Sequence, residues 1–434
     1  MPVKNEVNVT NISFYVILGA KRGFSMKKIP IVILVMILSV CVAALDVSDG
    51  GAYKGIVTTP FGTTLSGNSK SLSYKLYKNP SALASNGFVL ELPSVSVSVF
   101  NVANTMTSSS GAQALSNMLN GNMNRENAIK LAVAMLEGIG NGKNSFMGID
   151  PGFGFASRGF ALGFEARAVV RTMPALEDSG DSSATQSLLT TDIVPVVDGG
   201  ITVGIGFRIW EKGSSYLDIG AAVRYALKYY ITNLNAKTVI DNIRNETGFA
   251  FDRYTVGGYA IPFDLGLTYG MLDGKIRFSA AVNNLNGYYR MQNYDNIEDA
   301  VTMKNGYNRT TLYTPWTVGM AFEYEPGWKF FSPVFSFTFD DINGFVAEDL
   351  STDEGKRPLL ELVRHLTARI DVRIARVISL SAAFSEGYPE FGTSLDIWGN
   401  QLELRYGYHE AGSLYGSKPV DAFTIRFRLG YDNN

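Results

Sequence analysis

Apolar side chains occupy every second position in about fourteen stretches of roughly ten residues between residues 88 and 431. The last stretch is the clearest, because one set of alternate positions reads Phe423, Ile425, Phe427, Leu429, Tyr431 and the other reads Thr424, Arg426, Arg428, Gly430. Side chains of a β-strand point alternately to opposite faces. One face of this strand is therefore apolar, and the other carries two guanidinium groups.

No other part of the chain is large and apolar enough to cover so many apolar strand faces. A closed barrel with lipid outside and water inside needs no cover and leaves no unpaired edge in the hydrocarbon. The pattern therefore predicts an all-β fold, a transmembrane antiparallel β-barrel of about fourteen strands with an N-terminal plug and short helices in outer loops. The expected strands are 88–100, 145–156, 160–172, 199–211, 215–230, 259–270, 275–286, 313–325, 332–340, 363–374, 376–386, 391–398, 401–409 and 421–431.

Short and long connections alternate along the chain. Tight-turn residues such as Gly159, Gly213 and Gly274 fill the short connections. The long connections are expected at 101–144, 173–198, 231–258, 287–312 and 341–362. This asymmetry is typical of a barrel with short periplasmic turns and longer outer loops, and an even strand number returns both ends to the periplasm.

The N-terminal region predicts export. Residues 26–44 contain two lysines, an apolar run and small residues at Val42 and Ala44, which describe a signal peptide cleaved after Ala44. A transmembrane anchor, or lipidation at Cys41, is the weaker alternative. Residues 1–25 are then an extension preceding the true start. We expect residues 45–86 to form a periplasmic or lumenal hatch, because they are polar and lack long alternation, and residues 87–434 to form the barrel.

Composition narrows the function further. Only 18% of residues are charged and the formal net charge is −2, which argues against nucleic-acid binding. The mean hydropathy of +0.05 is low for a helical membrane protein. His365 and His409 are the only histidines and stand outside any metalloprotease or nucleophile-elbow motif. The sequence therefore predicts neither an enzyme nor a metal or other cofactor.

Most charged residues fall on the predicted lumen-facing rows. The basic ones are Arg167, Arg208, Arg224, Lys228, Arg277, Arg369, Arg373, Arg405, Arg426 and Arg428. The acidic ones are Glu165, Asp218, Asp264, Glu323, Asp371, Asp396 and Glu403. Such charges either pair across strands and fix the interior or form a selectivity ladder for anionic solutes, and the first alternative is the commoner one.

The first long connection has helical periodicity. Ile129, Val133 and Leu136 would lie on one face of a helix that begins near Asn124. These residues either pack on the barrel rim or form a collecting groove for a hydrophobic ligand.

The segment from Tyr77 to Ala84 reads Tyr-Lys-Asn-Pro-Ser-Ala-Leu-Ala. Its Asn79-Pro80-Ser81 motif resembles the N-terminal hatch of the FadL family of long-chain fatty-acid and hydrocarbon transporters, and a similar segment opens the related PorV and TraF-like barrels. The resemblance implies a fourteen-stranded barrel whose hatch is held in the lumen by Asn79 and Pro80. In that family the ligand-collecting helices lie in later outer loops than the helix expected here.

These observations predict a protein of the bacterial outer membrane that takes up small hydrophobic compounds, such as long-chain fatty acids, by passive passage. The alternative is a PorV-like barrel that binds protein partners at its outer loops during secretion or surface assembly. The expected partners are lipid and a hydrophobic small molecule, not nucleic acid. The sequence leaves the oligomeric state open.

Overall fold

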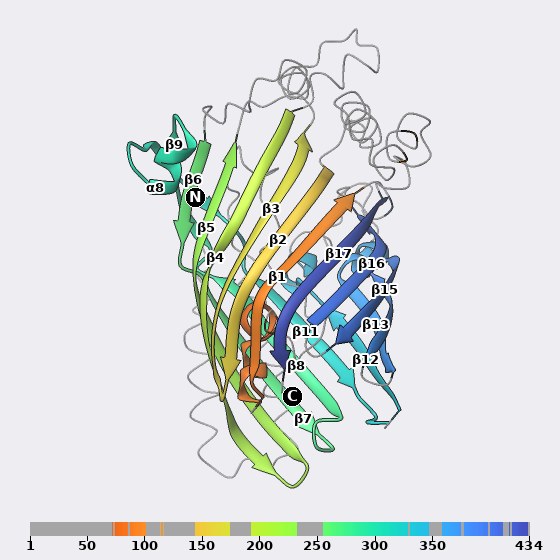
Figure 1. Cartoon of the computed structure of the whole chain (residues 1–434). Coiled ribbons are helices and arrows are strands. Elements are labelled where there is room, and N and C mark those ends of the chain that lie inside the picture. Colours follow the sequence, from red (N-terminus) through yellow and green to blue (C-terminus); the bar gives the residue numbers. More distant parts are fainter. Residues whose placement is uncertain are drawn as a thin grey trace, which may run out of the picture.

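The computed structural model describes residues 72, 74–85, 87–100, 113, 116, 144–173, 192–231, 255–328, 330–346, 358–374, 377–397, 400–410, 416 and 419–432. These residues form a closed antiparallel barrel (Figure 1). The strand segments are β1 Val89–Phe100, β2 Asn144–Ser157, β3 Phe160–Met173, β4 Asp192–Lys212, β5 Ser215–Ile231, β6 Thr255–Ala260, β7 Phe263–Met271, β8 Ile276–Leu285, β9 Tyr288–Tyr294, β10 Tyr307–Tyr313, β11 Thr317–Tyr324, β12 Phe331–Phe339, β13 Leu366–Ile374, β14 Ile378–Ser385, β15 Tyr388–Ile397, β16 Asn400–Glu410 and β17 Pro419–Asp432.

The barrel closes between its first and last strands. β1 pairs with β17 from Val89 opposite Asp432 to Phe100 opposite Ala422. Each barrel strand otherwise pairs with its sequence neighbours, so the chain forms a meander. Closure removes the two open edges that a flat sheet of this size would expose.

Three of the barrel strands are interrupted, which is why seventeen segments form fourteen strands. β5 pairs with β6 along one part of its length and with β7 along the other, so that β6 and β7 are one strand broken at Pro262. In the same way β9 continues β8, and β10 continues β11. The prediction of a barrel of about fourteen strands is confirmed.

The three interruptions are adjacent in the wall and bonded to one another. The Arg224 amide donates to the Pro262 carbonyl over 3.0 Å, and the Thr314 amide donates to the Gly287 carbonyl over 2.8 Å. The Asn286 side-chain amide donates to the Ile261 carbonyl over 3.0 Å. These bonds replace part of the ladder that is lost at Pro262, which has no amide hydrogen to donate.

The outer face of the wall is apolar. On β4 the side chains of Ile201, Val203, Ile205 and Phe207 are between 41% and 52% exposed, whereas Thr202 between them is fully buried. On β17 Ile425 and Phe427 are exposed and Arg428 is buried. A belt of this kind is the lipid-contacting surface of a transmembrane barrel. Among the described residues, no helix is long and apolar enough to span a membrane.

Some predicted boundaries were wrong. The region 287–312, expected to be a connection, contains β9, the helix α8 Ile297–Thr302 and β10. β4 begins at Asp192 and β6 at Thr255, inside the connections predicted at 173–198 and 231–258. Strand ends beyond the hydrocarbon need no lipid-facing row, so their sequence loses the alternation. The strand predicted from 363 begins at Leu366.

Two further short helices lie between β12 and β13 in the chain. α9 Ile342–Gly344 follows β12, and α10 Pro358–Arg364 precedes β13. In α9, Asn343 accepts a hydrogen bond from the Val318 amide over 2.8 Å and donates to the Trp316 carbonyl over 2.7 Å. It thereby pairs with the end of β11 as a strand backbone would.

Candidate functional site

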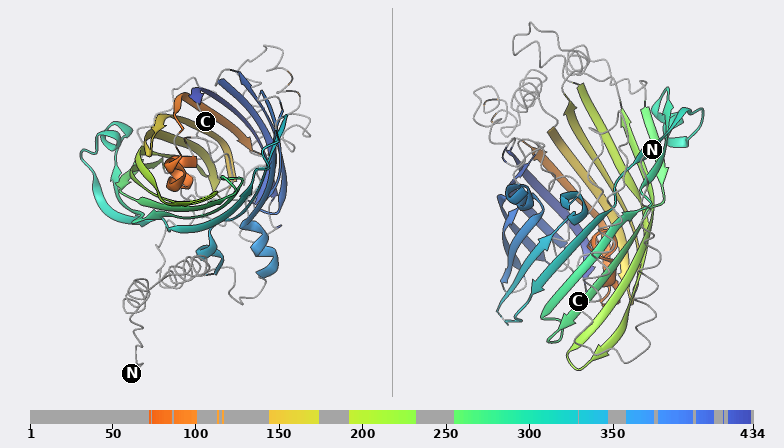
Figure 2. Two further views of the ribbon diagram at one scale, coloured as in Figure 1. Left: turned by 90° about the horizontal axis from the view of Figure 1, so that it is seen from below. Right: turned by 180° about the vertical axis from the view of Figure 1, so that it is seen from behind.

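Two short helical segments lie inside the ring of strands, as the view along the barrel shows (Figure 2, left). They are η3 Tyr74–Lys78 and η4 Pro80–Ala84. Asn79 lies between them in an extended conformation and caps η4, because its side chain accepts from the Ser81 amide over 3.1 Å. Pro80 suits the first position of η4, where an amide hydrogen would have no partner. We call residues 72–85 the hatch.

A buried polar cluster fixes the hatch to the wall. Asn79 donates from Nδ2 to Oγ1 of Thr268 on β7 over 3.1 Å. The Ser81 hydroxyl lies 2.6 Å from Oδ1 of Asn79 and 2.7 Å from Oγ1 of Thr268, which in turn lies 2.9 Å from the Ser279 hydroxyl on β8. Asn79 and Ser81 are fully buried. Because buried polar groups are costly when unpaired, this cluster favours one position of the hatch.

Glycines on four neighbouring strands allow the close approach. The glycine seat consists of Gly163 on β3, Gly204 and Gly206 on β4, Gly220 on β5 and Gly266 on β7. Gly206 lies opposite Gly220, which lies opposite Gly266. A Cβ at Gly206 would lie 2.9 Å from the Pro80 carbonyl oxygen, and one at Gly220 would collide with the Pro80 backbone.

Hydrophobic contacts complete the seat. A Cβ at Gly204 would lie 2.7 Å from Cδ1 of Leu83 and 3.1 Å from Cδ2 of Leu76. Leu76 and Leu83 belong to a buried cluster with Val89 on β1 and Ala161 on β3. The hatch is therefore a packed part of the barrel interior on the side of β3, β4, β5 and β7.

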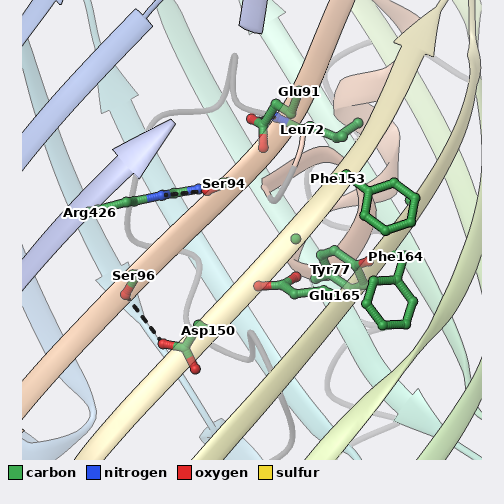
Figure 3. A pocket seen from close by; sticks show the side chains of 12 residues that line it. Leu72, Tyr77, Glu91, Ser94, Ser96, Asp150, Phe153, Phe164, Glu165 and Arg426 are labelled. Carbon is green, nitrogen blue, oxygen red and sulfur yellow. Dashed lines mark hydrogen bonds between the residues drawn. The ribbon is translucent and has the colours of Figure 1, made fainter. Parts of the chain in front are cut away.

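A cavity of about 120 Å³ lies between the hatch and the adjoining wall formed by β1, β2, β3 and β17 (Figure 3). Its polar lining comes from Tyr77, Glu91, Ser94, Ser96, Asp150, Glu165 and Arg426, and its apolar lining from Leu72, Phe153 and Phe164, with Gly152 and Gly163. The size is close to the roughly 150 Å³ of an apolar cavity that holds benzene in another protein. A single aromatic ring is thus of the right order of size for this space.

The wall beside the cavity is irregular. β1 and β2 change register beside the cavity: Glu91 lies opposite Gly154, and Ser94 lies opposite Gly152. The two β1 residues in between, Leu92 and Pro93, therefore face a single residue of β2, Phe153. Pro93, within this bulge, cannot donate to the ladder. Phe153 is 56% exposed and stacks on Phe164 with ring centroids 5.1 Å apart. Gly152 lines the cavity and has no side chain, so at this position the strand backbone itself lies between the cavity and the outer face.

The predicted lumenal charges form ion pairs along the wall. Their acidic partners lie mostly on adjacent strands: Arg167 with Asp150 (3.4 Å), Arg208 with Asp218 (2.8 Å), Arg224 with Asp264 (2.7 Å), Lys228 with Asp198 (2.6 Å), Arg277 with Glu323, Arg369 with Asp371 (2.8 Å) and Glu390 (3.3 Å), Arg405 with Glu403, and Arg428 with Glu91 (3.3 Å). Arg426 donates to the Ser94 hydroxyl over 3.3 Å. Arg373 lies opposite Ser332 and Ser379 and is half-buried. These contacts fit the structural interpretation of the charges better than a ladder of unpaired cations.

The Arg224–Asp264 pair joins the hatch to the interrupted strands. The Arg224 guanidinium lies 5.4 Å from the centre of the Tyr77 ring. Asp264 also accepts from the Asn284 amide over 2.6 Å, and the Asn284 side chain donates to the Thr314 carbonyl over 2.8 Å. This buried network therefore spans the strands on both sides of the breaks.

Burial shifts the pKa values of three hatch side chains, raising those of Tyr74 and Tyr77 and lowering that of Lys78. Desolvation lowers the pKa of the Lys78 ammonium to about 8; nearby Asp340 opposes this shift, and Arg405, Arg369 and Arg426 add to it. Desolvation raises the pKa of the Tyr77 hydroxyl, with a smaller contribution from Glu165. The Tyr77 hydroxyl thus stays protonated at neutral pH.

The structure describes the predicted hatch residues but not the residues of the predicted ligand groove. It brings Asn79, Pro80 and Ser81 together against the wall. The proposed ligand groove of Ile129, Val133 and Leu136 lies outside the described residues. Among the described residues, no group of histidine, cysteine, aspartate and glutamate side chains could hold a metal ion. Sequence reasoning missed Thr268 and the glycine seat, whose members give no signal until the strand register is known.

Comparisons with known proteins add little. No family model matches the chain, and no curated protein matches it. Solved structures with a similar outline include the Pseudomonas putida toluene transporter TodX (11% identity, TM-score 0.41) and a Pseudomonas aeruginosa FadL homologue (11% identity, TM-score 0.42), each match covering 87% of this chain and 98% of the other. The translocator domain of the autotransporter NalP from Neisseria meningitidis has 11% identity and a TM-score of 0.32, with 80% of this chain and 88% of that chain covered. Because these TM-scores are below 0.5, we assign no function from the likenesses.

Proposed function

We propose that this barrel lies in the bacterial outer membrane and lets small hydrophobic compounds pass without an energy source. The exposed apolar belt supports a membrane location, and an even number of antiparallel strands is usual in single-chain outer-membrane barrels. Passage is supported by one observation above all, the cavity between the hatch and the irregular wall at β1 and β2.

The physical advantage of such a route is that the compound avoids water for most of its path. A molecule in the cavity lies beside Leu72 and near a wall made thin by Gly152. Local opening of the bulge at Pro93 would let it leave sideways into the hydrocarbon. The hatch, held inside the barrel by its contacts with the glycine seat, would meanwhile narrow a straight aqueous path.

Gly152 offers a direct test. A Cβ there would meet its nearest atoms, the Phe164 carbonyl oxygen and Cγ of Glu165, at 3.4 and 3.7 Å, so a larger side chain would enter the cavity with little cost to the wall. Uptake of radiolabelled toluene and of a long-chain fatty acid would be measured in cells that lack other hydrophobic uptake barrels. We expect G152V to lower toluene uptake severalfold, because the cavity has the size of a single aromatic ring.

The matched control is G148V on the same strand, where a Cβ would have its nearest contact at 3.7 Å from Cγ2 of Val169. Gly148 does not line the cavity. Equal uptake by the unmodified protein, G152V and cells without the barrel would contradict transport. If the barrel passes neither compound and instead co-purifies with a defined protein, the scaffold alternative replaces it.

A further inference from the structure

Among the described residues, one carboxylate oxygen of the cavity lining has neither a hydrogen-bond partner nor an ion pair, whereas Oδ1 of Asp150 still has its ion pair with Arg167. Oε2 of Glu165 is buried and has no hydrogen-bond partner among the described residues. The carboxylate is directed into the cavity, on the same side as the Tyr77 ring (Figure 3). A buried acceptor without a donor costs folding free energy, so it indicates a donor that arrives from outside.

The other carboxylates around the cavity have partners. Glu91 accepts from Arg428 and from the Leu72 amide, each over 3.3 Å. Asp150 pairs with Arg167 over 3.4 Å and accepts from the Ser96 hydroxyl over 3.4 Å. Glu165 is therefore the acidic residue of this lining that is placed to contact a ligand.

We infer that the cavity is selective for ring-sized, uncharged compounds that carry a hydroxyl group, such as phenols and aromatic alcohols, whose hydroxyl donates to Oε2 of Glu165. The inference rests on the proposed function and names its substrate class. The ring would occupy the space next to Leu72, and the hydroxyl would supply the donor that Glu165 lacks.

Other ligand classes fit this lining less well. A carboxylate would be placed among Glu91, Asp150 and Glu165, with Arg426 as the basic residue of the lining. A plain hydrocarbon would leave Glu165 buried and unpaired. Sites built around hydrogen-bonding groups discriminate strongly against ligands that lack the matching group. An ammonium ion would pair with Glu165 but could not leave through the thin wall, because a charge in hydrocarbon is expensive.

The test uses the full-length mature barrel in lipid nanodiscs and fluorine NMR with 4-fluorophenol, 4-fluorotoluene and 4-fluorobenzoate. Empty nanodiscs measure partitioning of each probe into lipid. We expect 4-fluorophenol to bind up to about tenfold more tightly than 4-fluorotoluene, since one hydrogen bond to a buried partner contributes about 0.5–1.5 kcal/mol. We expect 4-fluorobenzoate to bind most weakly.

The decisive variant is E165M, which keeps the side-chain length and removes the acceptor. It should bind 4-fluorotoluene at least as well as the unmodified protein and lose the preference for 4-fluorophenol. E390M is the control, because Glu390 contacts Arg369 on another part of the wall and does not line the cavity. The migration of unheated samples in a gel reports whether each barrel is folded. If E165M does not fold, E165Q replaces it, and we expect E165Q to show a reduced preference for 4-fluorophenol.

The inference is overturned if the unmodified protein binds the phenol and the toluene equally, if E165M keeps the preference, or if the benzoate binds most tightly. Uptake by cells separates this result from the proposed function. Toluene uptake without phenol preference would leave transport intact and remove the selectivity. Phenol preference in nanodiscs without uptake of any probe would keep the binding site and remove transport.

Discussion

The side-chain amide of Asn79 donates to the hydroxyl of Thr268 over 3.1 Å, across 189 residues of sequence. This bond attaches a segment inside the barrel to the middle of β7. It is effective only because Gly266, two residues before Thr268, leaves room for the Asn79 side chain. The hatch and the wall are therefore two parts of one packing arrangement.

Replacement of Asn79 and Thr268 should show that they act as a pair. We expect N79A to destabilise the hatch by about 1–3 kcal/mol, because the hydroxyls of Ser81 and Thr268 lose a buried partner. Rates of proteolysis between residues 74 and 85 would be compared for N79A, T268V and the double variant. Strictly additive effects would contradict coupling between the two side chains.

A methyl group in the glycine seat should displace the hatch. We expect G220A to cost about 1–3 kcal/mol through overpacking against Pro80 and to raise the ion conductance of the barrel in planar bilayers. G148A serves as the control, because a Cβ there has only ordinary contacts. A conductance of G220A equal to that of the control would show that the hatch tolerates the added atom.

The inward and outward rows of β17 should respond differently to charge. Ile425 is 42% exposed on the apolar belt, whereas Thr424 lies 2.9 Å from the Ser98 hydroxyl. We expect I425R to cost about 2–4 kcal/mol near the bilayer midplane and T424R to cost much less. Reversible unfolding in urea from lipid vesicles would measure both, and equal losses would mean that the two faces have been assigned wrongly.

Loss of the Asp264 carboxylate should be among the most damaging changes in the wall. We expect D264A to cost about 3–5 kcal/mol, because the buried Arg224 would keep its charge without its partner. Glu211 also pairs with Arg208, but its side chain is 62% exposed. E211A should therefore cost less than about 1 kcal/mol. Comparable midpoints of urea unfolding for the two variants would disprove the distinction.

Export remains a prediction from the N-terminal sequence alone. We expect the mature protein to begin near Leu45 and to fractionate with the outer membrane. Mass spectrometry of the purified protein would check the cleavage site. Residues 26–44 retained on the mature protein would contradict the assignment of a signal peptide.

The sequence by itself determined the strands and their faces, because side-chain alternation is a local property of an extended chain. That is why the row from Phe423 to Tyr431 could be assigned before the structure. The same alternation placed strand boundaries at residues 286 and 313. The strands in fact extend beyond both boundaries, through Tyr288–Tyr294 and Tyr307–Tyr313, because the apolar pattern changes at the breaks.

Only the tertiary structure decided how the interior is organised. Gly206, Gly220 and Gly266 form one surface because the strand register places them opposite one another. The alternation of apolar and polar side chains cannot reveal such a surface, because glycine has no side chain. Glu165 appeared in the sequence as one lumenal acid among several. Its unpaired oxygen became visible only when the neighbouring carboxylates were seen with their partners, because pairing depends on distances between strands that the sequence does not contain.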